Sequence, residues 1–257
     1  MSEHVHTETD GRIGTVTIDR SENLNALTSE INTALRDAFE KLDGEVDVIV
    51  LRSAGDRAFV AGADIEEIHD RTAREFERFQ KNGRETNDTI ADCGAVVIAA
   101  VRGIAYGGGF ELALAADMIV ASEGAEFATP EAKLGLVPGG GATQRLPRAV
   151  GPNKAKELLT TGDPIPAEEA ERLGLVNRVV PDDEVEEAAR SLADDVAGNA
   201  PLAVRRAKQL VDEGLEMSLE GALSYEQEVT FTLYGTEDAD EGIASFVEDR
   251  EAEFSGR

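Results

Sequence analysis

The sequence predicts an α/β fold that is followed by a helical C-terminal region. Residues 95–101 form an unbroken apolar run rich in β-branched side chains, which is typical of a strand covered on both faces. Residues 31–42 carry apolar side chains at helical spacing. Beyond residue 182 the pattern is helical throughout. We therefore expect an α/β core over residues 1–198 and a helical region over residues 199–257.

The core should alternate between strands and helices. Apolar runs and alternating patterns predict strands at residues 11–19, 46–52, 95–101, 118–121 and 175–180. Helical spacing predicts helices at 31–42, 65–93, 142–150, 153–160 and 167–173, with one more after the glycines at 107–109. Thr28 and Ser29 before an acidic first turn form a capping pattern for the first helix. Gly174 should end the helix before it, and Pro181 should end the last strand.

The chain beyond residue 182 should contain four helices. They are expected at residues 184–197, 202–213, 219–234 and 237–254. The first ten residues are polar and acidic, and we expect them to be flexible. They contain no apolar signal-peptide core, and no later run has the eighteen or so apolar residues of a membrane span. These features predict a cytoplasmic protein that does not enter a membrane.

Charge is the most unusual bulk property of the chain. It has 52 acidic residues against 25 basic ones and a formal net charge of −27. Nucleic acid is therefore excluded as an expected partner, because phosphate binding needs patches of lysine and arginine. The excess is spread along the chain and arginine outnumbers lysine, as in proteins of salt-loving organisms. We expect such a chain to lose stability in dilute buffer through self-repulsion.

Few residues are suited to a metal or redox site. The single cysteine, Cys93, excludes an intrachain disulfide and a cysteine metal cluster. His4 and His6 lie in the polar N-terminus, and His69 lies in an acidic segment where a solvated surface role is expected. We therefore predict no metal site.

Two glutamates stand in settings that do not suit a surface carboxylate. Glu111 follows three glycines and opens a helix with almost no polar face, and Glu131 precedes a second glycine run. Glycines let backbone N–H groups approach a ligand, and a helix N-terminus favours negative charge. Each glutamate alone could be structural, as a partner for the helix dipole or as a surface residue at a helix start. Together they predict acid/base chemistry beside a carbonyl group.

Several motifs resemble the enoyl-CoA hydratase/isomerase family, the crotonases. In this chain they lie at residues 25–27, 58–64, 103–112, 127–131, 134–139, 141–146, 161–162, 174–176 and 241–248. Their order and spacing resemble the family from Gly11 to about Phe254, with most similarity to a short-chain enoyl-CoA hydratase from a halophile. The resemblance implies a crotonase-like spiral of ββα units, as in ClpP and crotonase. It also implies a C-terminal helical trimerisation region, with two trimers commonly stacked into a hexamer.

The resemblance also implies a substrate and a site. An acyl-CoA thioester would bind with its carbonyl oxygen against the backbone N–H groups of Ala63 and Gly108. Family members that hydrate double bonds keep both glutamates, so Glu111 and Glu131 favour addition of water to a trans-2-enoyl-CoA to give a 3-hydroxyacyl-CoA. We assign Glu111 mainly to water activation and Glu131 mainly to protonation of C2, while the two share a proton network. The Gly139 backbone should also lie near the water.

Coenzyme A enters this reaction as part of the substrate, so no cofactor is expected. By resemblance, its binding residues are Leu24, Ala61, Asp64, Ile65 and, from a neighbouring subunit, Phe246. The chain departs from the family at Glu22 and Asp249, where relatives often have lysine. Arg20 and Arg250 are nearby cations that could compensate for the missing lysines.

Two alternatives to a hydratase remain open on the sequence. The first is another crotonase reaction on an acyl-CoA, such as double-bond isomerisation or carbon–carbon bond cleavage or formation. The second is a non-enzymatic crotonase-like scaffold or RNA-binding relative. RNA binding would need a basic helix, whereas residues 72–92 mix arginine and lysine with glutamate and aspartate. Glutamine substitutions at Glu111 and Glu131 separate these classes, because only an enzyme would lose turnover.

Overall fold

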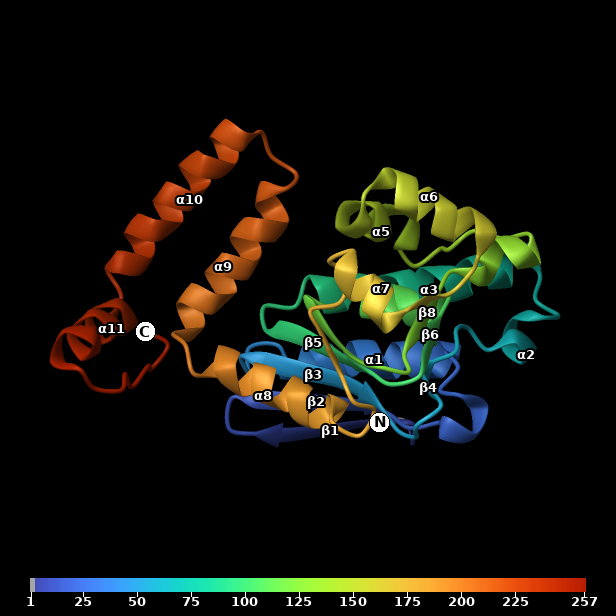
Figure 1. The fold of residues 1–257 in the computed structure, drawn as a ribbon, viewed down its shortest axis with the longest axis horizontal. Coiled ribbons are helices and arrows are strands. Elements are labelled where there is room, and N and C mark those ends of the chain that lie inside the picture. The colour runs from blue at the N-terminus through green and yellow to red at the C-terminus, as the bar shows by residue number, and fades with distance from the viewer. Residues whose placement is uncertain (1–2) are drawn as a thin grey trace.

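Two β-sheets form the core, and a helical arm extends from one end of it (Figure 1). The computed structural model describes residues 3–257. The larger sheet has the order β1-β2-β3-β5-β7-β10, and all its neighbours are parallel except β1 and β2. Its strands are β1 (Val5–Asp10), β2 (Ile13–Ile18), β3 (Val48–Ser53), β5 (Val96–Val101), β7 (Met118–Ser122) and β10 (Arg178–Val180). The smaller sheet contains β4 (Ala58–Val60), β6 (Ile104–Tyr106), β8 (Glu126–Ala128) and β9 (Ile165–Pro166).

The chain winds through both sheets in repeated turns. In each of the pairs β3/β4, β5/β6 and β7/β8, the first strand joins the larger sheet and the second joins the smaller one. Helical segments follow each pair, namely α2 (Ile65–Ile68) and α3 (Ala73–Ala91), then α4 (Gly108–Ala113), then the 3-10 helix η2 (Pro130–Leu134). This arrangement confirms the expected spiral of ββα units.

Both faces of the larger sheet are buried, as the apolar runs predicted. Val48 and Ile98 face one cluster with α8 (Val185–Ala197), while Ile49 and Val97 face the main core with α1 (Ser29–Leu42). Successive residues of a strand point to opposite faces, so an unbroken apolar run can fill two cores. Thr28 caps α1 by accepting a hydrogen bond from the Ile31 N–H, in agreement with the expected capping pattern.

Three expectations from the sequence are wrong. The N-terminus is not flexible over its full length, because β1 pairs with β2 along six residue pairs. The expected helix over 65–93 is two helices, and Thr72 begins the second with a capping box. The last helix stops at Glu248, because Asp249 adopts a left-handed φ of 53°. The tail then folds back, and the buried Asp238 carboxylate accepts hydrogen bonds from the Ser255 and Gly256 N–H groups.

Four helices complete the core and its surface. They are α5 (Ala142–Val150), α6 (Pro152–Thr161), α7 (Ala167–Arg172) and α8, which was introduced above. The helix before Gly174 ends as expected, because Gly174 has a positive φ of 78°. No helix within residues 3–257 is long and apolar enough to cross a membrane.

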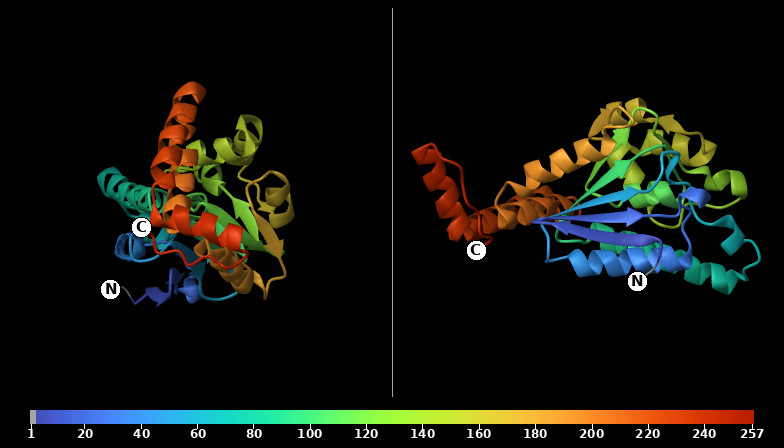
Figure 2. Two further views of the ribbon diagram at one scale, coloured as in Figure 1. Left: turned by 90° about the vertical axis from the view of Figure 1, so that its left-hand side faces the viewer. Right: turned by 90° about the horizontal axis from the view of Figure 1, so that it is seen from below.

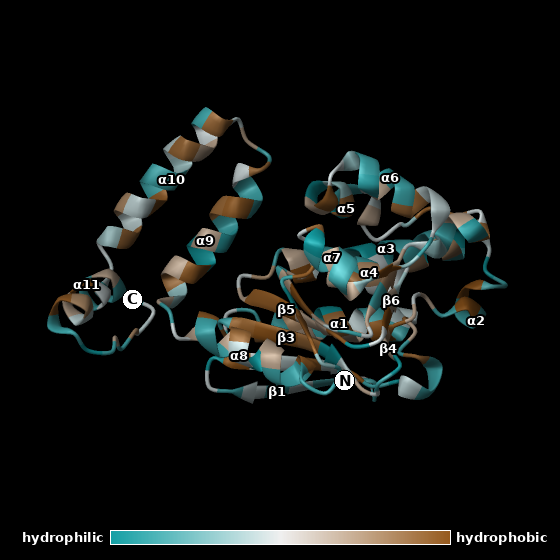
Figure 3. Ribbon diagram, viewed as in Figure 1, coloured by the Kyte–Doolittle hydropathy of each residue, from teal (hydrophilic) through white to brown (hydrophobic). Residues whose placement is uncertain are grey.

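The arm consists of α9 (Pro201–Gly214), α10 (Leu219–Tyr234) and α11 (Glu237–Glu248). Figure 2 shows that it extends away from the sheets. Two ion pairs fasten α9 to the core: Lys208 Nζ lies 2.8 Å from Asp117 Oδ2, and Arg205 Nη2 lies 3.4 Å from Asp47 Oδ1. The arm also exposes apolar side chains along its length (Figure 3). They are Val211, Leu215, Met217, Leu219, Leu223, Phe231, Tyr234, Ile243, Phe246 and Val247.

Candidate active site

Two backbone N–H groups lie together where β4 and β6 end. Leu27 donates to the Gly62 carbonyl and accepts from the Asp64 N–H, both at 2.8 Å, in a parallel bridge around Ala63. Since the residues on either side of Ala63 make this bridge, the Ala63 N–H itself faces the other way. A Cβ placed on Gly108 would lie 3.7 Å from the Ala63 nitrogen.

Both N–H groups are free of partners within residues 3–257. Gly108 is the first residue of α4, so its N–H has no acceptor within the helix. Among the residues that the structure describes, no acceptor pairs with the N–H of Ala63 or Gly108. Unpaired N–H groups away from the surface are rare in folded proteins. Two of them side by side form a cradle for an oxygen that carries negative charge.

Glycine is required on both sides of Gly108 in the chain. Gly107 has φ +51° and ψ −121°, a conformation that disfavours residues with a side chain, and its N–H donates to the Ala128 carbonyl at 2.9 Å. A Cβ on Gly109 would lie 2.1 Å from the Val60 carbonyl oxygen. The glycines therefore let α4 begin directly against β4.

Glu111 lies in the first turn of α4 and is 5% exposed. Its Oε1 accepts hydrogen bonds from the Gly140 N–H at 2.7 Å and the Ala142 N–H at 3.1 Å. Burial raises the pKa of Glu111 above its ordinary value, although these N–H groups and the charge of Arg145 act in the opposite direction. The hydrogen bonds fix the carboxylate and favour its ionised form.

Glu131 lies in η2, close to the glycine turn that precedes α4. A Cβ on Gly107 would come within 2.9 Å of Glu131 Oε1. Its Oε2 is buried and has no hydrogen-bond partner among residues 3–257. Burial first, and the nearby charge of Glu111 second, raise the pKa of Glu131 to about 7. A carboxyl group with such a pKa can hold a proton near neutral pH and release it.

The second glycine run lies against Glu111. Gly139 is exposed, whereas Gly140 is buried and donates its N–H to Glu111. The Gly140 carbonyl accepts hydrogen bonds from Asn87 Nδ2 at 3.0 Å and Arg145 Nη1 at 3.1 Å. Asn87 and Arg145 were not among the predicted site residues. Arg145 lies in the motif at residues 141–146, whereas Asn87 lies in a mixed-charge helix whose sequence does not indicate a functional site.

Three of the expected coenzyme A contacts lie beside the cradle. Leu24 has a left-handed φ of 52°, and its carbonyl accepts from the Ala61 N–H at 3.1 Å. Ile65 begins α2 and is 53% exposed. The structure therefore brings Leu24, Ala61 and Ile65 to the same region as Ala63.

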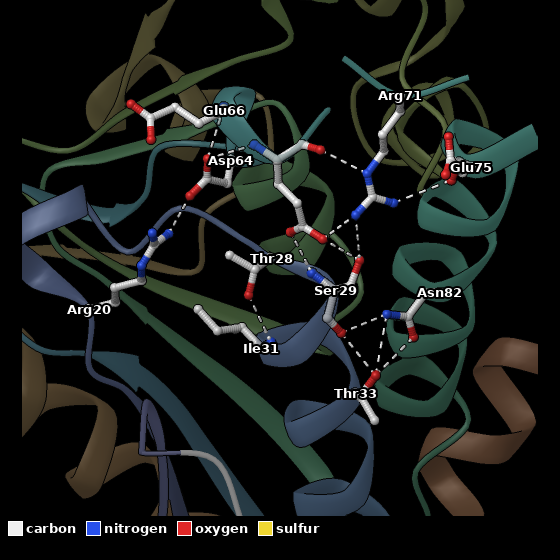
Figure 4. Close-up of polar contacts among 11 residues, drawn as sticks. Arg20, Thr28, Ser29, Ile31, Thr33, Asp64, Glu66, Arg71, Glu75 and Asn82 are labelled. Carbon is white, nitrogen blue, oxygen red and sulfur yellow. Dashed lines mark hydrogen bonds and ion pairs between the residues drawn. The ribbon is translucent and has the colours of Figure 1, made fainter. Parts of the chain in front are cut away.

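The Asp64 carboxylate has a structural role (Figure 4). It caps α2 by accepting from the Glu66 and Glu67 N–H groups, and it lies 2.6 Å from Arg20 Nη1. Burial acts to raise the pKa of Asp64, but Arg20 and the two N–H groups outweigh it and the pKa is lowered. Asp64 and Arg20 therefore hold the segment that contains Ala63.

The two arginines that were expected to compensate for the missing lysines are both ion-paired. Arg20 is paired with Asp64, and Arg250 is paired with Glu241 and Glu248. Arg57, in contrast, has no ion-pair partner among the described residues, and its Nη2 donates only to the Ser21 carbonyl at 3.2 Å. It lines a cavity of about 200 Å³ together with Leu24 and other residues of that loop.

Phe246 is not part of this site within one protomer. It lies on α11, which is at the opposite end of the molecule from α4 (Figure 3). Its side chain is 88% exposed.

The chain is similar to known proteins over nearly its whole length. A family model described as enoyl-CoA hydratase/isomerase matches residues 8–257. The chain is 40% identical to a probable enoyl-CoA hydratase of Mycobacterium bovis, covering 99% of each chain. It is 38% identical to a short-chain-enoyl-CoA hydratase of Clostridium acetobutylicum, covering 97% of each. A solved structure of an enoyl-CoA hydratase from Bacillus anthracis superposes with a TM-score of 0.97 at 34% identity, covering 99% of this chain and 100% of that one.

Proposed function

Because the chain belongs to the enoyl-CoA hydratase/isomerase family, we infer that it is an enoyl-CoA hydratase, a hydro-lyase. It adds water across the 2,3 double bond of a trans-2-enoyl-CoA and yields a 3-hydroxyacyl-CoA. The observation that carries this proposal is the pair of carboxylates with raised pKa, Glu111 and Glu131, beside the Ala63 and Gly108 N–H cradle. Having both carboxylates at this place favours a hydratase over most other crotonase reactions.

The cradle stabilises charge on the thioester oxygen. As hydroxide adds to C3 of the conjugated thioester, negative charge develops on that oxygen, and the Ala63 and Gly108 N–H groups donate to it. Such donors act on the transition state more than on the substrate, so they raise the rate. Losing one donor would cost about 10²- to 10³-fold in rate.

The two carboxylates divide the proton transfers. Glu111, whose ionised form is favoured by two N–H donors, takes a proton from water as the oxygen attacks C3. Glu131, whose Oε2 has no donor and whose pKa is about 7, delivers a proton to C2. The proton gained by Glu111 then returns to Glu131 within their shared network and restores the starting state. The exposed Gly139 backbone is the proposed further contact for the water.

The coenzyme A moiety lies along Leu24, Ala61, Asp64 and Ile65. Asp64 takes part through its backbone, because its side chain caps α2. Arg57 is the proposed cation for the coenzyme A phosphates, because it lines the cavity beside Leu24 and lacks a carboxylate partner there. The proposed chemistry uses only these residues and the substrate, which brings its own coenzyme A.

The arm is the proposed oligomerisation region. Its exposed apolar side chains exceed what a free helical surface normally carries and favour a covering partner. A homotrimer, or two stacked trimers, would cover them and would let Phe246 approach a neighbouring subunit's coenzyme A.

The test is loss of the conjugated-thioester absorbance of crotonyl-CoA in molar potassium chloride. Wild type should consume the absorbance rapidly, and Glu131→Gln should be nearly inactive. Glu168→Gln is the matched control, because Glu168 is exposed on α7. A folded wild type that leaves crotonyl-CoA unchanged would argue for another acyl group or another crotonase reaction.

A further inference from the structure

One carbonyl group in the glycine run receives two side-chain donors. Asn87 Nδ2 and Arg145 Nη1 both donate to the Gly140 oxygen, at 3.0 and 3.1 Å. Asn87 is 5% exposed, so its amide is not available to solvent. Arg145 is held in turn by Asp88, with Nη2 lying 3.1 Å from Oδ1. Neighbouring residues of α3 therefore hold Gly140 directly and through Arg145.

Gly140 also holds the carboxylate of Glu111, the proposed base. The Gly140 N–H donates to Glu111 Oε1 at 2.7 Å, while its carbonyl accepts from Asn87. The packing leaves no room between the three residues, because a Cβ on Gly140 would lie 2.6 Å from both Asn87 Nδ2 and Glu111 Oε2. A displacement of Gly140 would therefore displace the Glu111 carboxylate.

We propose that Asn87 is a positioning residue for hydration: it fixes Gly140 so that the N–H groups of Gly140 and Ala142 aim the Glu111 carboxylate at the attacking water. This inference rests on the proposed hydratase function. Asn87 need not touch the substrate, since it acts through Gly140. Small errors in the placement of a reacting group are costly, because a shift of about 1 Å can lower a rate about 10²-fold.

The chemistry of the amide suits this position. A leucine has the same branching and the same number of heavy atoms but bulkier methyl groups, and it would leave the Gly140 carbonyl with Arg145 alone. An aspartate would repel that carbonyl and would add negative charge near Glu111. The charged groups around Glu111 are Arg145 from α5 and Glu131 from η2, and Asp88 is paired with Arg145. Once the glycine run moves, Glu111 loses N–H donors, so its protonated form is favoured to a higher pH.

The chain offers a matched control on the same helix. Asn82 also lies on α3 and donates its Nδ2 to a backbone carbonyl, that of Ser29, at 2.8 Å. This bond joins α3 to α1 and does not involve the glycine run. Asn87→Leu and Asn82→Leu therefore both remove an amide–carbonyl hydrogen bond from the same helix. Asn82→Leu also removes the contacts of Asn82 with Thr33 and Arg36, but only Asn87→Leu affects Gly140.

The experiment measures hydration of crotonyl-CoA by both variants in molar potassium chloride, across pH, together with their melting temperatures. For Asn87→Leu we expect kcat to fall about 10- to 100-fold. We expect KM to stay within about two-fold, and the acidic limb of the pH–rate profile to move to higher pH. Asn82→Leu should lose melting temperature to a comparable extent and keep the wild-type kcat and pH profile.

A folded Asn87→Leu variant with wild-type kcat and pH profile would overturn the inference, whatever its melting temperature. Should Asn87→Leu not fold, Asn87→Asp serves instead, because it preserves volume. It should lose at least as much kcat, and wild-type turnover by it would equally contradict the positioning role. A wild-type protein that does not hydrate crotonyl-CoA would count against the proposed function. If the wild type hydrates crotonyl-CoA and Asn87→Leu keeps the same kcat, the result counts only against the positioning role of Asn87.

Discussion

Replacing Glu131 with glutamine should make the protein more stable above neutral pH while abolishing turnover. Burial and the charge of Glu111 raise the pKa of Glu131 from 4.5 to about 7. The folded protein thus binds this proton more tightly than the unfolded chain does. The stability that the group contributes is complete below about pH 4.5 and is lost as the pH rises through about 7. Glutamine does not titrate, so the variant avoids this loss.

The pKa difference sets the size of the effect. A rise from 4.5 to about 7 corresponds to about 3 kcal/mol for a fully buried group. Glu131 is only partly buried, and solvent screening reduces the expected gain to about 1–2 kcal/mol. Carboxylates placed for catalysis commonly cost stability in this way.

The assay is urea unfolding of wild type, Glu131→Gln and the exposed control Glu168→Gln in molar potassium chloride. The free energy of unfolding of Glu131→Gln should exceed that of wild type by an amount that grows by about 1 kcal/mol between about pH 5.5 and 8.5. The control should show no such growth. A difference that is constant with pH, or one that shrinks as the pH rises, would refute the reasoning.

Three further predictions concern the core and the surface charge. Lys208→Met leaves Asp117, whose side chain is 20% exposed, without its cation, so the free energy of unfolding should fall by about 3 kcal/mol. Adding Asp117→Asn to this variant should restore most of the lost free energy, as measured by urea titration. Gly109→Ala places a Cβ against the Val60 carbonyl and should cost about 3 kcal/mol or prevent folding, whereas Gly214→Ala, with its Cβ 3.6 Å from the nearest atom, should be tolerated. With a net charge of −27, the melting temperature should rise between dilute buffer and molar potassium chloride, and a constant value would contradict the proposed role of salt.

Local patterns in the sequence were sufficient to predict the parts of the fold that depend on near neighbours. The double-faced strand β5, the cap of α1 and the glycine turn before Glu111 each lie within a few residues and were predicted. The strand β1 was missed because only Val5 of its six residues is buried, so its alternation is weak. The strands β4 and β8 have three residues each, which is too short for a period to be recognised.

Less of the site could be predicted from the sequence, because its contacts join segments that are far apart in the chain. Ala63 could be paired with Gly108 only through the family resemblance, since nothing near Ala63 in the chain indicates that its N–H is unpaired. Asn87 and Arg145 converge on a backbone oxygen of Gly140, and a backbone acceptor leaves no mark in the sequence. Arg20 and Arg250 were candidates for binding the coenzyme A phosphates, but each forms an ion pair within the fold, Arg20 with Asp64 and Arg250 with Glu241.

The cradle comes from two different turns of the spiral, and this has a consequence for the order in which the protein folds. Ala63 follows β4 and Gly108 follows β6, and the two strands align through the pairs Ala58–Ile104 and Val60–Ala105. The donors therefore have no fixed separation until this distant pairing has formed. Pairing between segments far apart in the chain closes a long loop and is slow compared with helix formation. During refolding, the helical signal will recover before the ability to hold a thioester oxygen, so regained turnover marks the completion of the core.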